Sequence, residues 1–534
     1  MKTTIKNLIL SAVLVVGGAS CVDLDTAPYD RETDLTYWEE DPEAAVKALN
    51  TCYTYLGNMD EQLYCEAMTD NAYTKQPNDA TQNIGNGSYS TADPYVKKVW
   101  DGRYTGIRMC NELLENIDRV PDLDPELKKR YIGEAKVLRA YNYYELYTKF
   151  GDVPYTTKVL SIKESMSIAR TAKATVIANV LADLDEVING NYLPTSYDAD
   201  NKGRITRWAA MAIKAKIYLF EGNWTQVKNI TSTIMTEGGF KLFGSYAVLF
   251  EIANEYNSEV ILDAQYRPTS REHQMMYVFL PPTLGGYSQL SPLQELVDSY
   301  IMLDGKTIKE TGTSFDESHP YANRDPRLKA TVMYTGNSYT LADGTEVVIN
   351  CEKGEGKDGY GVGSDCSATG YYIKKYWDNT YRATLYSGLN PILIRYADIL
   401  LMNAEALAEL GELDKTAWDA TIKPIRDRAG FTLASALEFP EGASKDKLIE
   451  IVRNERRSEL ALEGHRHKDI IRWRIADNVL NGWCHGLKTN DVVGTDDGYV
   501  RVENRTFNAN KHYLWPIPQA ERDLNGNLEQ NPNW

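Results

Sequence analysis

The chain has 534 residues, of which 43% are apolar and 25% charged, a composition typical of globular proteins rather than disordered or fibrous ones. Its length corresponds to about two to four domains' worth of core. The 58 Lys and Arg are outnumbered by 75 Asp and Glu, so the formal net charge is −17. Because nucleic-acid binding depends on neutralising phosphates with Lys and Arg, the sequence predicts no nucleic-acid partner.

The amino terminus has the pattern of a targeting signal. A positively charged start precedes an apolar stretch over residues 8–16, which is too short to span a bilayer, so residues 1–20 are predicted to be a signal peptide. The small residues before Cys21 resemble a bacterial lipoprotein lipobox, which implies cleavage and acylation at Cys21. An ordinary secretory signal with an incidental cysteine is the alternative. Residues 21–40, polar and acidic, are expected to form the lipidated cysteine and its tether.

Six further cysteines follow Cys21, and disulfides are permitted outside the cytoplasm. Cys351 and Cys366 bracket a glycine-rich loop and are predicted to form a disulfide. Because Cys-x-x-Cys spacing is absent from the sequence, we predict no zinc site. No cofactor is expected, and the sequence leaves a bound calcium ion open.

Most of the remaining chain, from residue 41 to 534, is predicted to form one mainly α body. Apolar residues three and four apart predict a helix over 126–150, and similar Ala- and Tyr-rich helices are expected over 206–221 and 396–410, each ending at a glycine. A second helix follows the last two after a very short turn. This alternation predicts tetratricopeptide-like helical hairpins, with a plain helix bundle as the alternative.

Long insertions interrupt these helices. Residues 61–96 are rich in Asn, Asp, Gly and Tyr and are predicted to be a long loop, whereas 259–390 mixes short strands with turns. Since long loops inside a compact protein are often functional, we expect the ligand site there. The helical scaffold is then expected over about 41–60, 97–258 and 391–534.

Signals for catalysis are weak. Glu455 and Glu459 lie one helical turn apart on an otherwise apolar stripe, but Arg453, Arg456 and Arg457 lie beside them. Because buried carboxylates persist when paired with guanidinium groups, we predict a structural ion network here rather than an acid–base pair. The GxGxxG string over 354–359 has no strand–turn–helix context and is expected to be a surface loop.

Several blocks together are similar to the SusD/RagB family of surface glycan-binding lipoproteins of Gram-negative bacteria. They occur in family order and read GEAKVLRAYNYYELYTKFGDVPY, GRITRWAAMAIKAKIYLFEGNW, GGYSQLSPLQELVDSY, LIRYADILLMNAEALAELG, NERRSELALEGHRHKDIIRW and LWPIPQAERDLNGNLEQNPNW. The resemblance implies a tetratricopeptide-like body with ligand loops, anchored by lipid to the outer membrane at the cell surface. It also implies a partner, a SusC-like TonB-dependent transporter, to which the protein delivers captured glycans without cutting them.

A flat aromatic side chain can cover the face of a sugar ring, while polar groups bind the hydroxyls at its edge. Tyr287 follows Gly285-Gly286, where many members of that family carry Trp. The residues with suitable chemistry in the two loop regions are predicted to contact the glycan: Asp70, Asn71, Tyr73, Lys75, Tyr89, Tyr95, Tyr277, Tyr287 and Trp377. Two other functions stay open, a lid for peptide import of the RagB type and a surface glycoside hydrolase.

Overall fold

The structure, a computed structural model, describes residues 33–75, 80–381 and 384–534. The predicted signal peptide, Cys21 and the first part of the tether lie outside the described residues. The structure is 46% helix and 10% strand, with only small sheets, which confirms the mainly α prediction. No helix in the described part of the chain combines the length and apolar character needed to cross a membrane.

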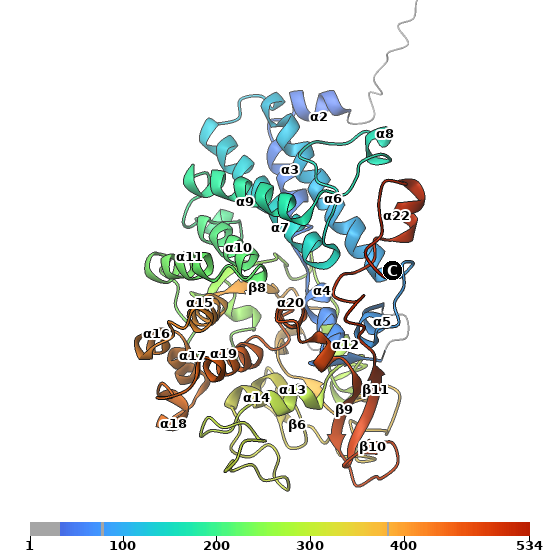
Figure 1. Ribbon diagram of the computed structural model, residues 1–534, viewed down its shortest axis with the longest axis vertical. Coiled ribbons are helices and arrows are strands. Elements are labelled where there is room, and N and C mark those ends of the chain that lie inside the picture. Colours follow the sequence, from blue (N-terminus) through green and yellow to red (C-terminus); the bar gives the residue numbers. More distant parts are fainter. Residues whose placement is uncertain (1–32, 76–79, 382–383) are drawn as a thin grey trace, which may run out of the picture.

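The helices stack side by side in chain order (Figure 1). Helix α6 packs against α7, α7 against α9, and the array continues through α10, α11, α15 and α19. This succession of antiparallel neighbours is the predicted tetratricopeptide-like scaffold. The helices of the array are α3 (Ala44–Tyr53), α6 (Pro94–Asn116), α7 (Pro125–Phe150), α9 (Lys173–Asn189), α10 (Arg207–Phe220), α11 (Trp224–Glu237), α15 (Tyr396–Leu410), α16 (Lys415–Ala420), α17 (Ile422–Ala429) and α19 (Lys445–Glu459).

Local chemistry sets where these helices begin and end. At α7 the Asp124 carboxylate accepts hydrogen bonds from two backbone N–H groups of the first turn, and Pro125 occupies the first helical position, where no N–H is needed. The helix ends at Gly151, whose φ of 72° is easily adopted only without a side chain. Helix α15 ends in the same way at Gly411, with φ of 73°.

Short helices surround this array. They are α2 (Asp34–Glu40), α4 (Met59–Tyr64), α5 (Ala80–Asn86), α8 (Ile162–Ser165), α12 (Met275–Phe279), α13 (Gln294–Ser299), α14 (Pro326–Thr331), α18 (Ala434–Leu437), α20 (Arg466–Arg472), α21 (Ala476–Val479) and α22 (Gln519–Leu524).

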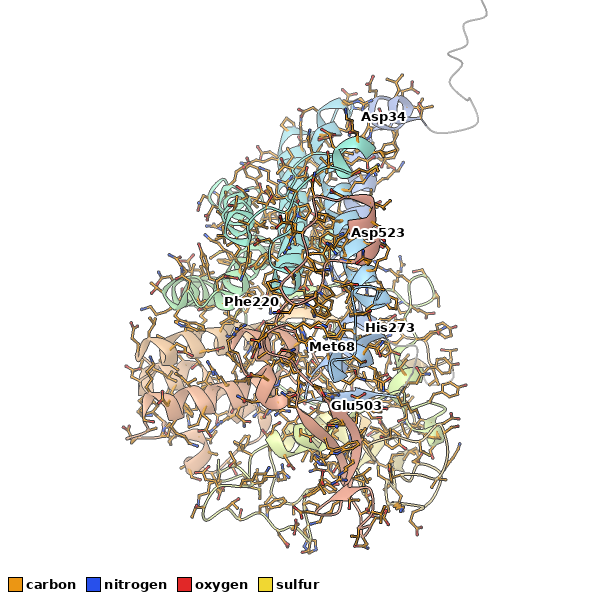
Figure 2. The ribbon with its side chains drawn as sticks, turned by 45° about the vertical axis from the view of Figure 1, so that its right-hand side comes forward. Asp34, Met68, Phe220, His273, Glu503 and Asp523 are labelled. Carbon is orange, nitrogen blue, oxygen red and sulfur yellow. The ribbon has the colours of Figure 1, made fainter. Side chains whose placement is uncertain are left out.

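The strands form small antiparallel sheets in the lower half of Figure 1. The two-stranded pairs are β1 (Ala72–Thr74) with β3 (Leu290–Pro292), β2 (Val260–Asp263) with β8 (Ile392–Arg395), β4 (Val332–Met333) with β7 (Tyr372–Ile373) and β5 (Ser338–Thr340) with β6 (Glu346–Val348). A three-stranded ribbon contains β9 (Gly482–Lys488), β11 (Tyr499–Arg505) and β10 (Thr495–Asp496). Asp34 lies at the top of Figure 2, at the opposite end of the molecule from this ribbon, which carries Glu503.

The carboxyl-terminal segment returns to the first helices of the array. The Trp515 ring packs edge-on against Phe150 with ring centroids 5.8 Å apart, and Phe150 packs against Trp100. The Asn531 side-chain amide donates to the backbone carbonyls of Phe150, at 2.9 Å, and Trp515, at 2.7 Å. The carboxyl-terminal segment and the helices α6 and α7 therefore share one hydrophobic core.

Two loop predictions are wrong in part. Residues 61–96 contain most of α4, all of β1 and α5, and the start of α6, rather than one long loop. Residues 34–40 of the predicted tether form α2, which begins with a capping box at Thr33 and buries Trp38. Trp38 thus docks the end of the tether on the body, and Arg119 adds ion pairs to Asp34 and Glu39.

The predicted disulfide is also wrong. Cys351 and Cys366 are both free thiols, and the Cys366 thiol instead donates to the backbone carbonyl of Lys357 at 3.3 Å. Proximity to a glycine-rich loop did not bring these two side chains together. The other four cysteines of the described residues are free as well.

Candidate functional site

Three tyrosines form a partly exposed aromatic platform. The rings of Tyr277, on α12, and Tyr287, in the turn before β3, are nearly parallel, with centroids 5.8 Å apart and an angle of 19° between them. The Tyr386 ring stands at 88° to Tyr277, with centroids 6.3 Å apart. Tyr287 and Tyr386 are 47% and 38% exposed, which is unusual for rings of this size. We name Tyr277, Tyr287 and Tyr386 the tyrosine platform.

The backbone holds the platform in place. Tyr287 N–H donates to the carbonyl of Tyr277 at 2.8 Å, which fixes the two ring-bearing segments side by side. Between them, a side chain at Gly286 would place its Cβ 2.1 Å from the carbonyl oxygen of Leu280. The Gly285-Gly286 pair is therefore needed for the tight turn that presents Tyr287.

The β1–β3 pair brings the amino-terminal candidates to the same place. Tyr73 pairs with Ser291, and Lys75 N–H donates to the carbonyl of Gln289, two residues beyond Tyr287. The Tyr73 hydroxyl accepts from the Gln82 amide at 3.3 Å, and the Lys75 ammonium donates to the carbonyl of Cys366 at 2.8 Å. Both side chains are partly exposed. Their segment runs beside β3, the strand that follows Tyr287.

Two other predicted contacts are structural instead. Asp70 is buried and accepts two hydrogen bonds from Arg466, each of 2.8 Å. It also forms an ion pair with Arg457 at 3.0 Å. Burial alone would raise the pKa of Asp70, but the two guanidinium groups outweigh it and hold this pKa below its usual range. The Asn71 amide is also buried and donates to Glu66 at 2.8 Å. Neither side chain faces a ligand.

The remaining predicted aromatics pack within the body. Tyr89 is only 5% exposed and lies between the rings of His512 and Trp534. Tyr95 faces Trp515 with centroids 6.1 Å apart, and the Trp377 indole donates to the carbonyl of Thr340 at 2.9 Å. Of these three residues, Tyr89 is excluded as a ligand contact by burial, and none belongs to the platform.

The sequence does not single out Tyr386 of the platform or Gln274, which lies beside it. The Gln274 amide donates to the Tyr386 hydroxyl, which orients that ring, and Gln274 itself is exposed. The strand-like bridge between His273 and Ser387 brings these two segments together. Because the segments are more than 100 residues apart, no local pattern indicates their proximity.

The predicted ion network is confirmed, but its arginines come from other elements. Glu455 and Glu459 are both buried, and the Glu459 carboxylate lies 2.6 Å from Arg395 and 2.8 Å from Arg327. Burial would raise the pKa of Glu459, but the surrounding guanidinium charges dominate and lower it. The carboxylates are therefore fixed as ions, a poor setting for acid–base chemistry.

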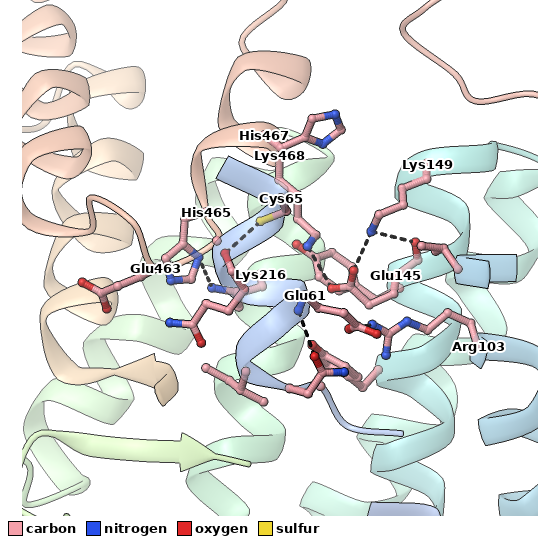
Figure 3. A pocket seen from close by; sticks show the side chains of 18 of the residues that line it. Glu61, Cys65, Arg103, Glu145, Lys149, Lys216, Glu463, His465, His467 and Lys468 are labelled. Atoms are coloured by element: carbon pink, nitrogen blue, oxygen red, sulfur yellow. Dashed lines mark hydrogen bonds and ion pairs between the residues drawn. The ribbon is translucent and has the colours of Figure 1, made fainter. Parts of the chain in front are cut away.

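A small inner cavity of about 100 Å³ lies where α4, α7 and α20 meet (Figure 3). In its lining, Glu145 binds Lys149 of the same helix at 2.6 Å and Lys468 of α20 at 2.9 Å. Burial and the nearby lysines lower the pKa of His465 and of His467 to about 3, so both rings are neutral at pH 7. The cavity is well below the roughly 300–1,000 Å³ of typical ligand pockets, and its lining lysines are paired.

No group of three or more His, Cys, Asp and Glu side chains suited to a metal ion occurs among residues 33–75, 80–381 and 384–534. The tyrosine platform, with its partly exposed rings, is the candidate site.

The resemblance seen in the sequence is confirmed by family models and relatives. The model described as the SusD family matches residues 248–534, and the one described as starch-binding associating with outer membrane matches residues 37–219. A SusD-like protein of Formosa agariphila is 27% identical over 514 residues, which cover 89% of this chain and 91% of that protein. A SusD-like protein of Bacteroides ovatus is 22% identical over 526 residues, with 92% and 88% covered.

Solved structures share the fold. A SusD-like carbohydrate binding protein of Bacteroides fragilis is 28% identical with a TM-score of 0.81, and the match covers 92% of this chain and 100% of that one. A laminarin binding SusD-like protein has a TM-score of 0.68 at 24% identity, covering 92% and 99%. Because one family model extends over more than half of the sequence and the fold matches almost throughout, the chain belongs to the SusD family.

Proposed function

We propose that the protein captures oligosaccharides at the cell surface, with the tyrosine platform as its binding site. The observation that carries the proposal is the pair of nearly parallel rings of Tyr277 and Tyr287, of which Tyr287 is 47% exposed and Tyr277 is partly buried. A sugar ring has apolar C–H groups on its faces and hydroxyls on its edge, so a flat aromatic surface covers the face and nearby polar groups bind the edge. Gln274, which binds the Tyr386 hydroxyl at the edge of the platform, is exposed and supplies such a group.

We further propose that the captured glycan passes uncut to a SusC-like TonB-dependent transporter. The family membership and the model named for association with the outer membrane support this role. The solved relatives are described as carbohydrate binding or laminarin binding proteins. The paired state of Glu455 and Glu459 supports a non-catalytic protein. Acylation at Cys21 would anchor the body to the membrane, in keeping with the lipobox-like residues before it.

The direct test is affinity electrophoresis of the mature chain in detergent against neutral polysaccharides, laminarin among them, with a set of peptides as competitors. We expect one glycan class to retard the wild-type protein, and Tyr287→Ala to weaken binding about tenfold, since burying such a ring contributes roughly 1.5–3 kcal/mol. Tyr256→Ala is the matched control, because Tyr256 is 41% exposed outside the platform.

Three results would contradict the proposal. Retardation that Tyr287→Ala and Tyr277→Ala leave unchanged would place the site elsewhere. Competition by peptides without any glycan binding would favour the peptide-import alternative. Release of new reducing ends from the bound polysaccharide would show a hydrolase.

A further inference from the structure

A second and larger cleft lies at the end of the molecule opposite to Asp34. It encloses about 1,030 Å³ and is lined by the β9–β11 ribbon on one side and by segments 315–324, 334–336 and 351–355 on the others. This volume is at the upper end of the range for small-molecule sites. None of the residues predicted to contact a glycan, and no residue of the tyrosine platform, lines it. We name it the ribbon cleft.

The wall of the ribbon cleft is aromatic. Tyr321 and Tyr334 stack with ring centroids 4.0 Å apart and an angle of 17°, and Tyr371 and Tyr499 also line the cleft. The Tyr321 and Tyr371 hydroxyls are 3.2 Å apart, and the Tyr371 hydroxyl donates to the Gln294 side chain at 2.6 Å. These hydrogen bonds fix the Tyr321 and Tyr371 rings. Because Tyr371 is only 2% exposed, the preformed aromatic surface of the wall is that of the partly exposed Tyr321, Tyr334 and Tyr499.

The rim of the cleft is polar and is joined across by two ion pairs. Lys488, at the end of β9, binds Glu317 on the facing segment at 2.6 Å. Lys353 binds Asp491, in the loop between β9 and β10. All four side chains are at least 39% exposed. Exposed pairs of this kind contribute only about 0–1 kcal/mol, so they can be exchanged for hydrogen bonds to another polar molecule at small cost.

The charge of the lining indicates a neutral ligand. The carboxylates Asp298, Glu317, Glu352, Glu355 and Asp491 outnumber the cations Arg324, Lys353 and Lys488. The buried Arg324 is already engaged with backbone carbonyls of Val297 and Tyr300. Uronate or sulfate groups would be repelled by this excess of negative charge. Neutral hydroxyls, in contrast, can donate hydrogen bonds to the carboxylates and accept them from the lysines.

We propose that the ribbon cleft is a second glycan-binding site, which takes a short neutral oligosaccharide independently of the tyrosine platform. The proposal rests on the proposed function, since its ligand belongs to the same class of molecule. Two sites on one chain hold a long polysaccharide more tightly than either alone, because the second contact is made within an already bound complex.

The test is the binding stoichiometry of the mature chain in detergent, measured by isothermal titration calorimetry. The probes are neutral tetrasaccharides of glucose, xylose, mannose and galactose, which are short enough to occupy one site each. We expect two sites per chain for at least one probe. Tyr334→Ala weakens one site about tenfold and Tyr287→Ala the other, so that each variant titrates with one site, whereas Tyr256→Ala keeps both. Lys488→Ala, which changes only an exposed rim residue, weakens the ribbon-cleft site severalfold if the cleft is used.

The possible outcomes separate the two proposals. One site, lost in Tyr287→Ala and unchanged in Tyr334→Ala and Lys488→Ala, would overturn the ribbon cleft and leave the proposed function intact. One site, lost in Tyr334→Ala and weakened in Lys488→Ala but unchanged in Tyr287→Ala, would support the cleft and remove the platform. No binding of any probe to the wild-type chain would overturn both. Thermal unfolding of each variant shows that a lost site is not a lost fold.

Discussion

Glu459 shows how a single buried charge can be stable at the centre of the molecule. Its carboxylate is fully buried and is bound by Arg327, Arg395 and Arg428, which come from three different parts of the chain. Two buried opposite charges attract strongly, but both lose their hydration, so such a group stabilises the fold only while all its partners are in place. Removing one charge leaves the others uncompensated.

We therefore predict that Glu459→Gln lowers the free energy of unfolding by about 3–5 kcal/mol. The loss arises because Arg395 and Arg428 keep their charges without a full counter-charge. Chemical denaturation of the wild-type and variant chains measures it. Glu450→Gln is the control, since Glu450 is 60% exposed and pairs only with the exposed Lys447. Equal, small effects of the two substitutions would contradict the structural importance of the network.

The turn between α12 and β3 is the element that positions the platform. Gly286→Ala is predicted to displace Tyr287, because the added Cβ would lie 2.1 Å from the Leu280 carbonyl oxygen. We expect glycan affinity to fall at least as far as in Tyr287→Ala, and thermal unfolding of the variant measures how much of the packing around the buried Gly286 is lost with it. Gly244→Ala is the control, since no atom lies within 4 Å of a Cβ there. Unchanged affinity in Gly286→Ala would show that the turn does not position the site.

The ribbon is joined to α13 through a histidine between two carboxylates. His485 lies 2.8 Å from Glu295 and 3.0 Å from Asp496, and these hydrogen bonds raise its pKa to about 8, above the ordinary value of 6.5. A group whose pKa is raised by folding stabilises the native state below its unfolded pKa, and this contribution is lost as the pH rises through the folded pKa.

Accordingly, the melting temperature of wild type should exceed that of His485→Gln at pH 6, and this difference should shrink as the pH rises through about 8. Differential scanning fluorimetry over pH 6–9 measures both chains. His319→Gln provides the comparison, because His319 is 73% exposed and bonds only within its own loop. A pH-independent difference for His485→Gln would refute the charged contact.

The sequence predicts elements well where the signal is local. The helices α7, α10 and α15 agree with their predicted ranges within a residue or two because apolar spacing and terminal glycines specify them. The strand β1 is missed because its partner β3 lies more than 200 residues away. Distant partners also explain why the sequence predicts Asp70 and Tyr89 as ligand residues. Asp70 is paired with Arg466 and Tyr89 is packed against Trp534, and both partners come from the other end of the chain.

At the scale of the whole molecule, the two segments matched by different family models form one body. Asn531 is 4% exposed and bonds the carbonyl of Phe150, so the last residues are part of the first helical core. Asn531→Ala should therefore lower the unfolding free energy by about 1–3 kcal/mol, because the Trp515 carbonyl loses the Asn531 amide as its donor and the Phe150 carbonyl retains a longer bond from Arg170, at 3.3 Å. Calorimetry should show one transition that shifts as a whole.

Asn527→Ala is the control, because Asn527 is exposed and its side chain makes one bond, to the carbonyl of Ser167. Two separate transitions, of which Asn531→Ala shifts only one, would show that the amino- and carboxyl-terminal parts unfold independently.

The position of Trp515 and Asn531 has a consequence for biosynthesis. The ribosome makes α6 and α7 about 400 residues before the segment that completes their packing. Domains commonly fold as they are synthesised, but here the first helices gain these packing partners only after residues 515–531 have been made. A chain interrupted before residue 515 would thus expose Phe150 and Trp100 and be open to proteolysis.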